Sequence, residues 1–100
     1  MSEYFSKLQS KEMDYLSEAM LTLKTKEDCY RFFEDIATIS EIKAFEQRLK
    51  VASMLKSKRT YVDIATATGA STATISRVNR CLTYGSDGYK LILERLKSKK

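Results

Sequence analysis

Apolar residues recur every three or four positions along most of the chain, which is the spacing of one face of an α-helix. Met13, Leu16, Met20 and Leu23 follow this spacing and predict a first helix over residues 10–24. The first 68 residues contain neither glycine nor proline, and the chain has no proline anywhere. The residues that normally break a chain into strands and turns are therefore missing. The pattern predicts an all-α protein.

Capping residues divide the next part of the pattern into two helices. Residues 25–28 (Thr-Lys-Glu-Asp) have the sequence of a capping box, and the helix that they open is expected to end near Thr38. Ser40 is the predicted N-cap of a long third helix that extends to about Lys58. Such a helix could form the core of a single bundle or a contact with a second subunit, and its sequence leaves both open. Its apolar face is broad and is formed by Ile42, Phe45, Leu49, Val51, Ala52 and Leu55.

Two short helices are predicted to meet at Gly69, over about residues 60–83. Residues 60–63 (Thr-Tyr-Val-Asp) form a second capping box, and glycine readily adopts the left-handed conformation that stops a helix. Ser71 can cap the following helix, which should end at Gly85. This arrangement is typical of the helix-turn-helix of DNA-binding proteins. The small or apolar residues expected to face inward are Ile64, Ala65, Ala70, Ile75 and Val78, and a last helix carries Tyr89, Ile92, Leu93 and Leu96 on one face.

The outward face of the second short helix has the residue types that DNA binding requires. Small hydroxyl and methyl groups in its first turn fit the major groove and can contact base edges. Basic residues before the motif and along the helix would neutralise phosphates. A simple structural hairpin of two helices is the alternative. The candidate DNA-binding residues are Lys56, Lys58, Arg59, Ala70, Ser71, Thr72, Ala73, Thr74, Arg77 and Arg80.

The charge of the chain supports a nucleic-acid partner. Its net charge of +5 is unevenly distributed, since residues 1–40 hold five Lys/Arg against eight Asp/Glu and residues 41–100 hold thirteen against five. Clustered cations gain affinity for a phosphate backbone by releasing its counterions. We therefore expect double-stranded DNA to bind the second part of the chain.

The composition excludes several other classes of function. A chain of 100 residues is one domain, and because it contains no histidine it has no candidate for the usual imidazole roles in catalysis or metal binding. Cys29 and Cys81 lie in apolar surroundings and are expected to be small buried residues. We expect no enzymatic activity, cofactor or metal. The chain shows no signal peptide and no apolar run long enough for a membrane span, so a soluble, cytoplasmic protein is expected.

Three segments of the chain resemble the Trp repressor superfamily, and within it the YerC/YecD-type branch. They are residues 41–49 (EIKAFEQRL), residues 69–77 (GASTATISR) and residues 29–36 (CYRFFEDI). The resemblance covers nearly the whole chain. It implies a six-helix, Trp-repressor-like subunit in an intertwined homodimer, with the fourth and fifth helices bound to DNA, and a role as a transcriptional repressor.

The resemblance also implies a candidate effector pocket formed by Arg48, Arg77, Val78 and Cys81. In Trp repressors the indole of tryptophan lies between two arginines, and Arg48 and Arg77 stand at the matching positions. The residue after the second arginine is glycine in that motif but Val78 here, and Cys81 replaces a serine hydroxyl. We therefore do not expect tryptophan to be an effector. The two arginines are expected instead to bind phosphates or to pair with Glu41, Glu46 or Asp63.

Two functions remain open from the sequence. The first is a dimeric, sequence-specific transcription regulator that binds DNA through the helix-turn-helix. The second is a helical protein-interaction module with a vestigial helix-turn-helix, which would act through the acidic first part of the chain and its aromatic residues Tyr15, Tyr30, Phe32 and Phe33.

Overall fold

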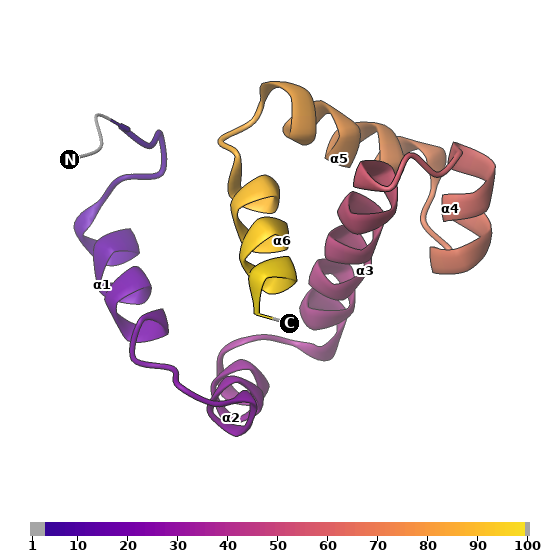
Figure 1. Cartoon of the computed structure of the whole chain (residues 1–100). Coiled ribbons are helices and arrows are strands. Elements are labelled where there is room, and N and C mark those ends of the chain that lie inside the picture. Colours follow the sequence, from indigo (N-terminus) through magenta and orange to yellow (C-terminus); the bar gives the residue numbers. More distant parts are fainter. Residues whose placement is uncertain (1–3, 100) are drawn as a thin grey trace. The chain divides into compact units, whose positions relative to one another are not determined.

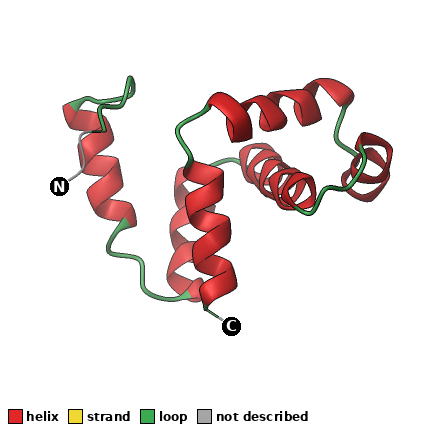
Figure 2. Ribbon diagram, turned by 45° about the horizontal axis from the view of Figure 1, so that its top comes forward, coloured by secondary structure: helices red, strands yellow, loops and turns green. Residues whose placement is uncertain are grey.

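A computed structural model of the chain describes residues 4–99, and the regular elements in this range are all helices (Figures 1 and 2). The prediction of an all-α, six-helix subunit is confirmed. The chain forms two compact units that divide between Thr38 and Ile39. The helices are α1 (Lys11–Met20) and α2 (Lys26–Ile36) in the first unit, and α3 (Ile39–Lys56), α4 (Tyr61–Thr68), α5 (Thr72–Tyr84) and α6 (Gly88–Ser98) in the second.

The helix α1 is shorter than its apolar spacing predicts. It begins close to the predicted start, with Ser10 as its N-cap, but it ends at Met20 rather than at residue 24. Beyond Met20 the backbone tightens, because the Thr22 N–H donates to Ala19 O and the Leu23 N–H to Met20 O, each at 3.1 Å. The Thr22 hydroxyl also donates to Ala19 O at 2.7 Å. These bonds close a turn at the point where the apolar pattern still continues.

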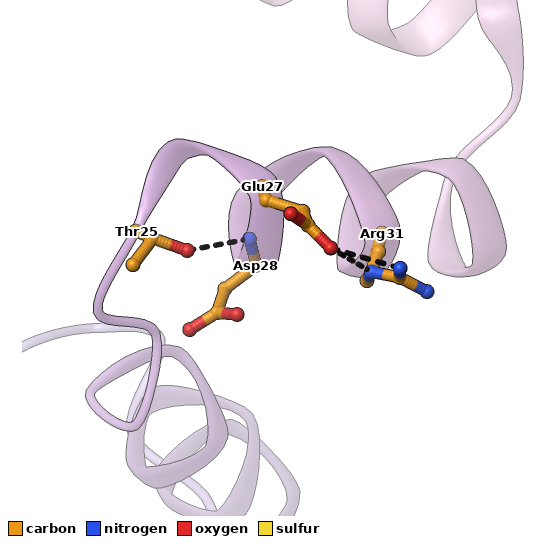
Figure 3. Close-up of polar contacts among 4 residues, drawn as sticks. All are labelled: Thr25, Glu27, Asp28 and Arg31. Carbon is orange, nitrogen blue, oxygen red and sulfur yellow. Dashed lines mark hydrogen bonds and ion pairs between the residues drawn. The ribbon is translucent and has the colours of Figure 1, made fainter.

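The helix α2 begins at the predicted capping residue (Figure 3). Thr25 Oγ1 accepts from the Asp28 N–H at 3.0 Å. The Asp28 carboxylate accepts from the Lys24 N–H at 3.0 Å, one residue before the partner that a standard capping box would use. One turn later, the guanidinium of Arg31 contacts the Glu27 carboxylate at 2.8 Å. Local polar contacts therefore fix the start of α2, and the Thr25 cap among them is the one that the sequence predicts.

The first unit leaves much of its apolar surface uncovered. Neither α1 nor α2 contains a buried residue. Phe32 and Phe33 pack against each other with ring centroids 5.7 Å apart, whereas Tyr15 and Leu21 are 76% and 84% exposed.

The helix α3 is the centre of the second unit. It contacts α4, α5 and α6, and α5 contacts both of its neighbours in sequence. Figure 1 shows α6 alongside α3, and α4 following α3 through a short turn. The side chains buried at these contacts form one hydrophobic core, which consists of Val51, Ala52, Met54, Ile64, Ala70, Ile75 and Val78.

The helix α3 starts at a different residue from the one predicted, and its apolar face is only partly buried. The helix begins at Ile39, so Ser40 lies in its first turn and is not the N-cap. A hydroxyl residue such as Ser40 is a favoured N-cap, but its presence does not by itself fix the residue at which a helix begins. The broad apolar face also divides, since Val51 and Ala52 are fully buried whereas Phe45 is 54% exposed. Part of that face is thus left uncovered.

Candidate nucleic-acid interface

The turn between α4 and α5 has the geometry that the sequence predicts. Thr60 caps α4, with its Oγ1 accepting from the Asp63 N–H at 3.1 Å. The helix ends at Thr68, and Gly69 follows in the left-handed conformation with φ of 73°. Ser71 then caps α5. Both predicted caps and the predicted stop are confirmed.

The inward side chains of the two helices hold them on α3. Ile64 and Ile75 are fully buried, and Val78 is 1% exposed. Ala70 is also buried, and its N–H donates to Thr68 Oγ1 at 3.1 Å. The Ala70 side chain therefore belongs to the core, and we leave it out of the proposed DNA contacts. The prediction that these residues face inward is confirmed.

The first turn of α5 presents small side chains to solvent. Ser71, Thr72 and Ala73 are exposed. Thr74 is half-buried, its N–H donates to Ser71 Oγ at 3.1 Å, and its hydroxyl accepts from the Ser71 hydroxyl at 3.2 Å. Thr74 is thus engaged in capping the helix, whereas Thr72 and Ala73 are available to a ligand.

Ser76 also belongs to this face, although it is not among the residues predicted from the sequence. It is exposed, as are Ala73 three residues before it and Arg80 four residues after it. Positions three and four apart lie on the same side of a helix. The buried residues Ile75 and Val78 lie on the other side of the helix. The helical periodicity that places these two residues inward also places Ser76 outward, and this pattern could have identified it.

Most of the candidate basic residues are exposed and lack an ion-pair partner. Lys56, Lys58, Arg77 and Arg80 are exposed, and none of them pairs with a carboxylate in the part of the chain that the structure describes. Arg59 differs, because its Nε lies 3.5 Å from Asp63 Oδ2. Both partners of that pair are about half exposed, so the contact is weak. Two of these unpaired cations, Lys56 and Lys58, therefore precede the helix-turn-helix in sequence, and Arg77 and Arg80 lie on α5 within it.

Lys58 occupies a strained backbone position at the end of α3. The helix ends at Lys56, two residues before the predicted end, in a Schellman motif. In this motif the Arg59 N–H donates to Met54 O at 3.1 Å and the Lys58 N–H to Leu55 O at 3.0 Å. Lys58 has φ of 61°, where glycine is favoured and a residue with Cβ costs about 1–2 kcal/mol. The turn separates Lys56 from Lys58 and Arg59.

The candidate effector pocket lacks the space that a glycine would leave. Val78 fills part of the core, and Arg48 and Cys81 are half-buried. Arg77 is exposed. Two of the carboxylates expected to pair with the arginines have other partners, because Glu46 lies 3.5 Å from Lys43 and Asp63 pairs with Arg59.

The described residues contain neither a metal-binding cluster nor a membrane-spanning helix. Residues 4–99 contain no group of three His, Cys, Asp or Glu side chains that could hold a metal ion. They also contain no helix long and apolar enough to cross a bilayer.

Comparison with known proteins agrees with this geometry. A family model described as Trp repressor protein matches residues 11–97. The chain is 57% identical over 91 residues to the protein YerC of Bacillus subtilis (strain 168), itself described as uncharacterized, and the match covers 91% of this chain and 88% of YerC. A crystal structure of a TrpR-like protein from Eubacterium eligens ATCC 27750 is similar with a TM-score of 0.87 and 55% identity, over 91% of this chain and 94% of that one. A structure from Staphylococcus aureus has the same TM-score with 49% identity, over 91% of each chain.

The left-handed conformation of Gly69 predicts the cost of adding a side chain there. A Cβ at Gly69 would meet no atom within 4 Å, so the penalty of Gly69→Ala comes from the backbone alone. We expect Gly69→Ala to lower the free energy of unfolding by about 1 kcal/mol. Chemical denaturation at one fixed protein concentration measures this change.

Gly88→Ala is the matched control. Gly88 also has open space around it, but its φ is not positive and it lies in α6. This substitution should leave the free energy of unfolding unchanged or raise it by up to about 1 kcal/mol. Equal effects of the two substitutions would contradict the assignment of the turn.

Proposed function

Since the chain belongs to the Trp repressor family, we propose that it is a sequence-specific DNA-binding transcription regulator. It acts as a homodimer and as a repressor, and it binds DNA through α4 and α5. One observation carries the proposal. The first turn of α5 exposes small side chains, and Lys56, Lys58, Arg77 and Arg80 have no ion-pair partner in residues 4–99.

In this proposal α5 enters the major groove with its N-terminal end. Thr72 and Ser76 supply hydroxyl groups that can bond base edges, and Ala73 can pack against a thymine methyl group. The exposed cations Lys56, Lys58, Arg77 and Arg80 contact phosphates, which fixes the orientation of the protein but carries no sequence information. Arg59 contributes less, because Asp63 partly neutralises it.

Uncovered apolar side chains support the homodimer. Phe45 is 54% exposed, Ile36 52% and Ile39 80%. Burial of such side chains is worth about 25 cal/mol per Å² of apolar surface, and a chain of this size buries only a modest core by itself. A second copy offers a matching surface, and a two-fold dimer would present two α5 helices to successive major grooves. A regulator of this kind acts on the chromosome, so we propose a cytoplasmic location and no catalytic role.

The roles of Arg80 and Thr72 can be separated by their effects on DNA affinity. We expect Arg80→Ala to weaken binding to every duplex by a similar factor and to reduce the slope of log affinity against log salt by about 1. Thr72→Ala should leave that slope unchanged and relax the preference at one base pair, with a loss of about 1–3 kcal/mol on the selected sequence. Fluorescence anisotropy with a duplex selected from a random pool and with an unrelated duplex measures both.

Arg31→Ala provides the control for the loss of a cation. Arg31 is exposed but pairs with Glu27 in the acidic first part of the chain. This variant should bind DNA as the unaltered protein does. Failure of the unaltered protein to bind any duplex at low salt would exclude DNA binding. It would favour instead a protein-interaction module, for which the exposed Tyr15 and Tyr30 would be the contacts.

The homodimer predicts a sedimentation mass of twice the 11.5 kDa chain at micromolar concentration. Phe45→Glu should shift the protein toward the monomer, because it places a charge in the proposed interface. Val62→Glu is the control, since Val62 is 75% exposed on α4, outside that interface. A monomeric unaltered protein would contradict the dimer.

Tryptophan should leave the protein unchanged. Val78 is 1% exposed and packs in the core where the family motif has glycine, so an indole ring has no space there. A ligand stabilises only the state that it binds. We therefore expect millimolar L-tryptophan to change neither the melting temperature nor the DNA affinity. Calorimetric detection of tryptophan binding would contradict this prediction.

A further inference from the structure

A side chain of α3 bonds to the turn of the helix-turn-helix. Gln47 Nε2 donates to the backbone oxygen of Thr68 at 3.1 Å, across 21 positions of the sequence. Thr68 is the last residue of α4. The last four carbonyl groups of a helix have no partner within that helix. Gln47 therefore supplies, from another helix, a donor for one of these carbonyl groups.

The bond from Gln47 fixes one end of the peptide group that starts the turn. The C=O of Thr68 and the N–H of Gly69 belong to the same planar peptide. The C=O accepts from Gln47, and the N–H donates to Ala65 O at 2.8 Å. With both ends bonded, this peptide cannot rotate freely. The orientation of the peptide plane that precedes Gly69 is therefore fixed, and the left-handed φ of Gly69 sets the direction of the chain relative to that plane.

The Thr68 hydroxyl continues the same set of contacts. It donates to Ile64 O at 2.7 Å and accepts from the Ala70 N–H at 3.1 Å. The N–H groups of Gly69 and Ala70 are thus both bonded within the turn, and Ser71 follows directly as the cap of α5. The direction in which α5 leaves the turn depends on these bonds.

Because of its position, the Gln47–Thr68 bond affects the orientation of α5 more than the free energy of unfolding. Gln47 and Thr68 line a shallow, open groove of about 350 Å³ between α3 and α4, together with Lys43, Glu46, Lys50 and Ala67. Because the groove is open to solvent, water can replace the amide of Gln47 as a donor to the Thr68 carbonyl group. The fully buried Ile64 and Ile75 would still hold the helices on α3. Apolar contacts, however, are not directional, whereas a hydrogen bond is.

We infer that Gln47 is a positioning residue that sets the orientation of α5, and through it the sequence specificity of DNA binding. The inference rests on the DNA binding proposed above. Base contacts need side chains held to within about 0.5 Å. Contacts of long Lys and Arg side chains with phosphates tolerate larger displacements. Loss of the Gln47 bond therefore affects specific binding more than non-specific binding.

Gln47→Met tests this inference, because methionine has a similar length and no N–H donor. We expect the ratio of affinities for the selected and an unrelated duplex to fall about threefold to tenfold, which corresponds to the net loss of one neutral hydrogen bond. The affinity for the unrelated duplex, the salt slope and the melting temperature should stay unchanged. Gln9→Met is the matched control, since Gln9 is exposed outside the second unit, and it should leave the ratio unchanged.

Gln47→Glu gives a second test that retains a polar side chain of the same length. Its carboxylate repels the Thr68 carbonyl group instead of bonding to it, so the ratio should fall at least as far as in Gln47→Met. An unchanged ratio in either variant, or equal losses on both duplexes, would overturn the inference. These outcomes differ from a failure of DNA binding itself, in which the unaltered protein binds neither duplex.

Discussion

Burial of Ile64, Ile75 and Val78 against α3 is the constraint on which the rest of the second unit depends. These side chains project from α4 and α5 toward Val51 and Ala52 and are excluded from solvent. Because a helix has 3.6 residues per turn, fixing its buried side also fixes which residues it exposes. Thr72, Ala73, Ser76 and Arg80 form the outer side of α5 for this reason. The candidate interface is therefore a consequence of the core.

Apolar contacts alone leave the two short helices some freedom, and polar contacts at the turn reduce it. Gly69 allows the left-handed conformation, Ser71 caps α5, and Gln47 bonds to the Thr68 carbonyl group. The hydrogen bonds made by Ser71 and Gln47 are directional, and each contributes only modestly to the free energy of folding. Their common effect is that two helices of 8 and 13 residues leave the turn in defined directions.

The charge and the backbone strain of Lys58 in the second unit agree with the proposed DNA binding. Lys58 keeps a left-handed conformation that glycine would adopt without strain, and its side chain is exposed without an ion-pair partner in residues 4–99. Strained backbone positions persist where the surrounding structure determines them, and they are frequent at functional sites. A lysine at this turn adds a cation beside α4 that glycine could not provide.

The sequence alone determined the features of this protein that depend on near neighbours. The caps Thr25, Thr60 and Ser71 and the stop at Gly69 each involve residues within four positions, so their patterns were sufficient. Spacing likewise predicted the inward side of α4 and α5. The sequence prediction was wrong at both ends of α3, which begins at Ile39 instead of after Ser40 and ends at Lys56 instead of at Lys58. Only the tertiary structure decided which part of the α3 face is buried and that Gln47 meets Thr68, since packing between helices brings together residues that are 21 positions apart.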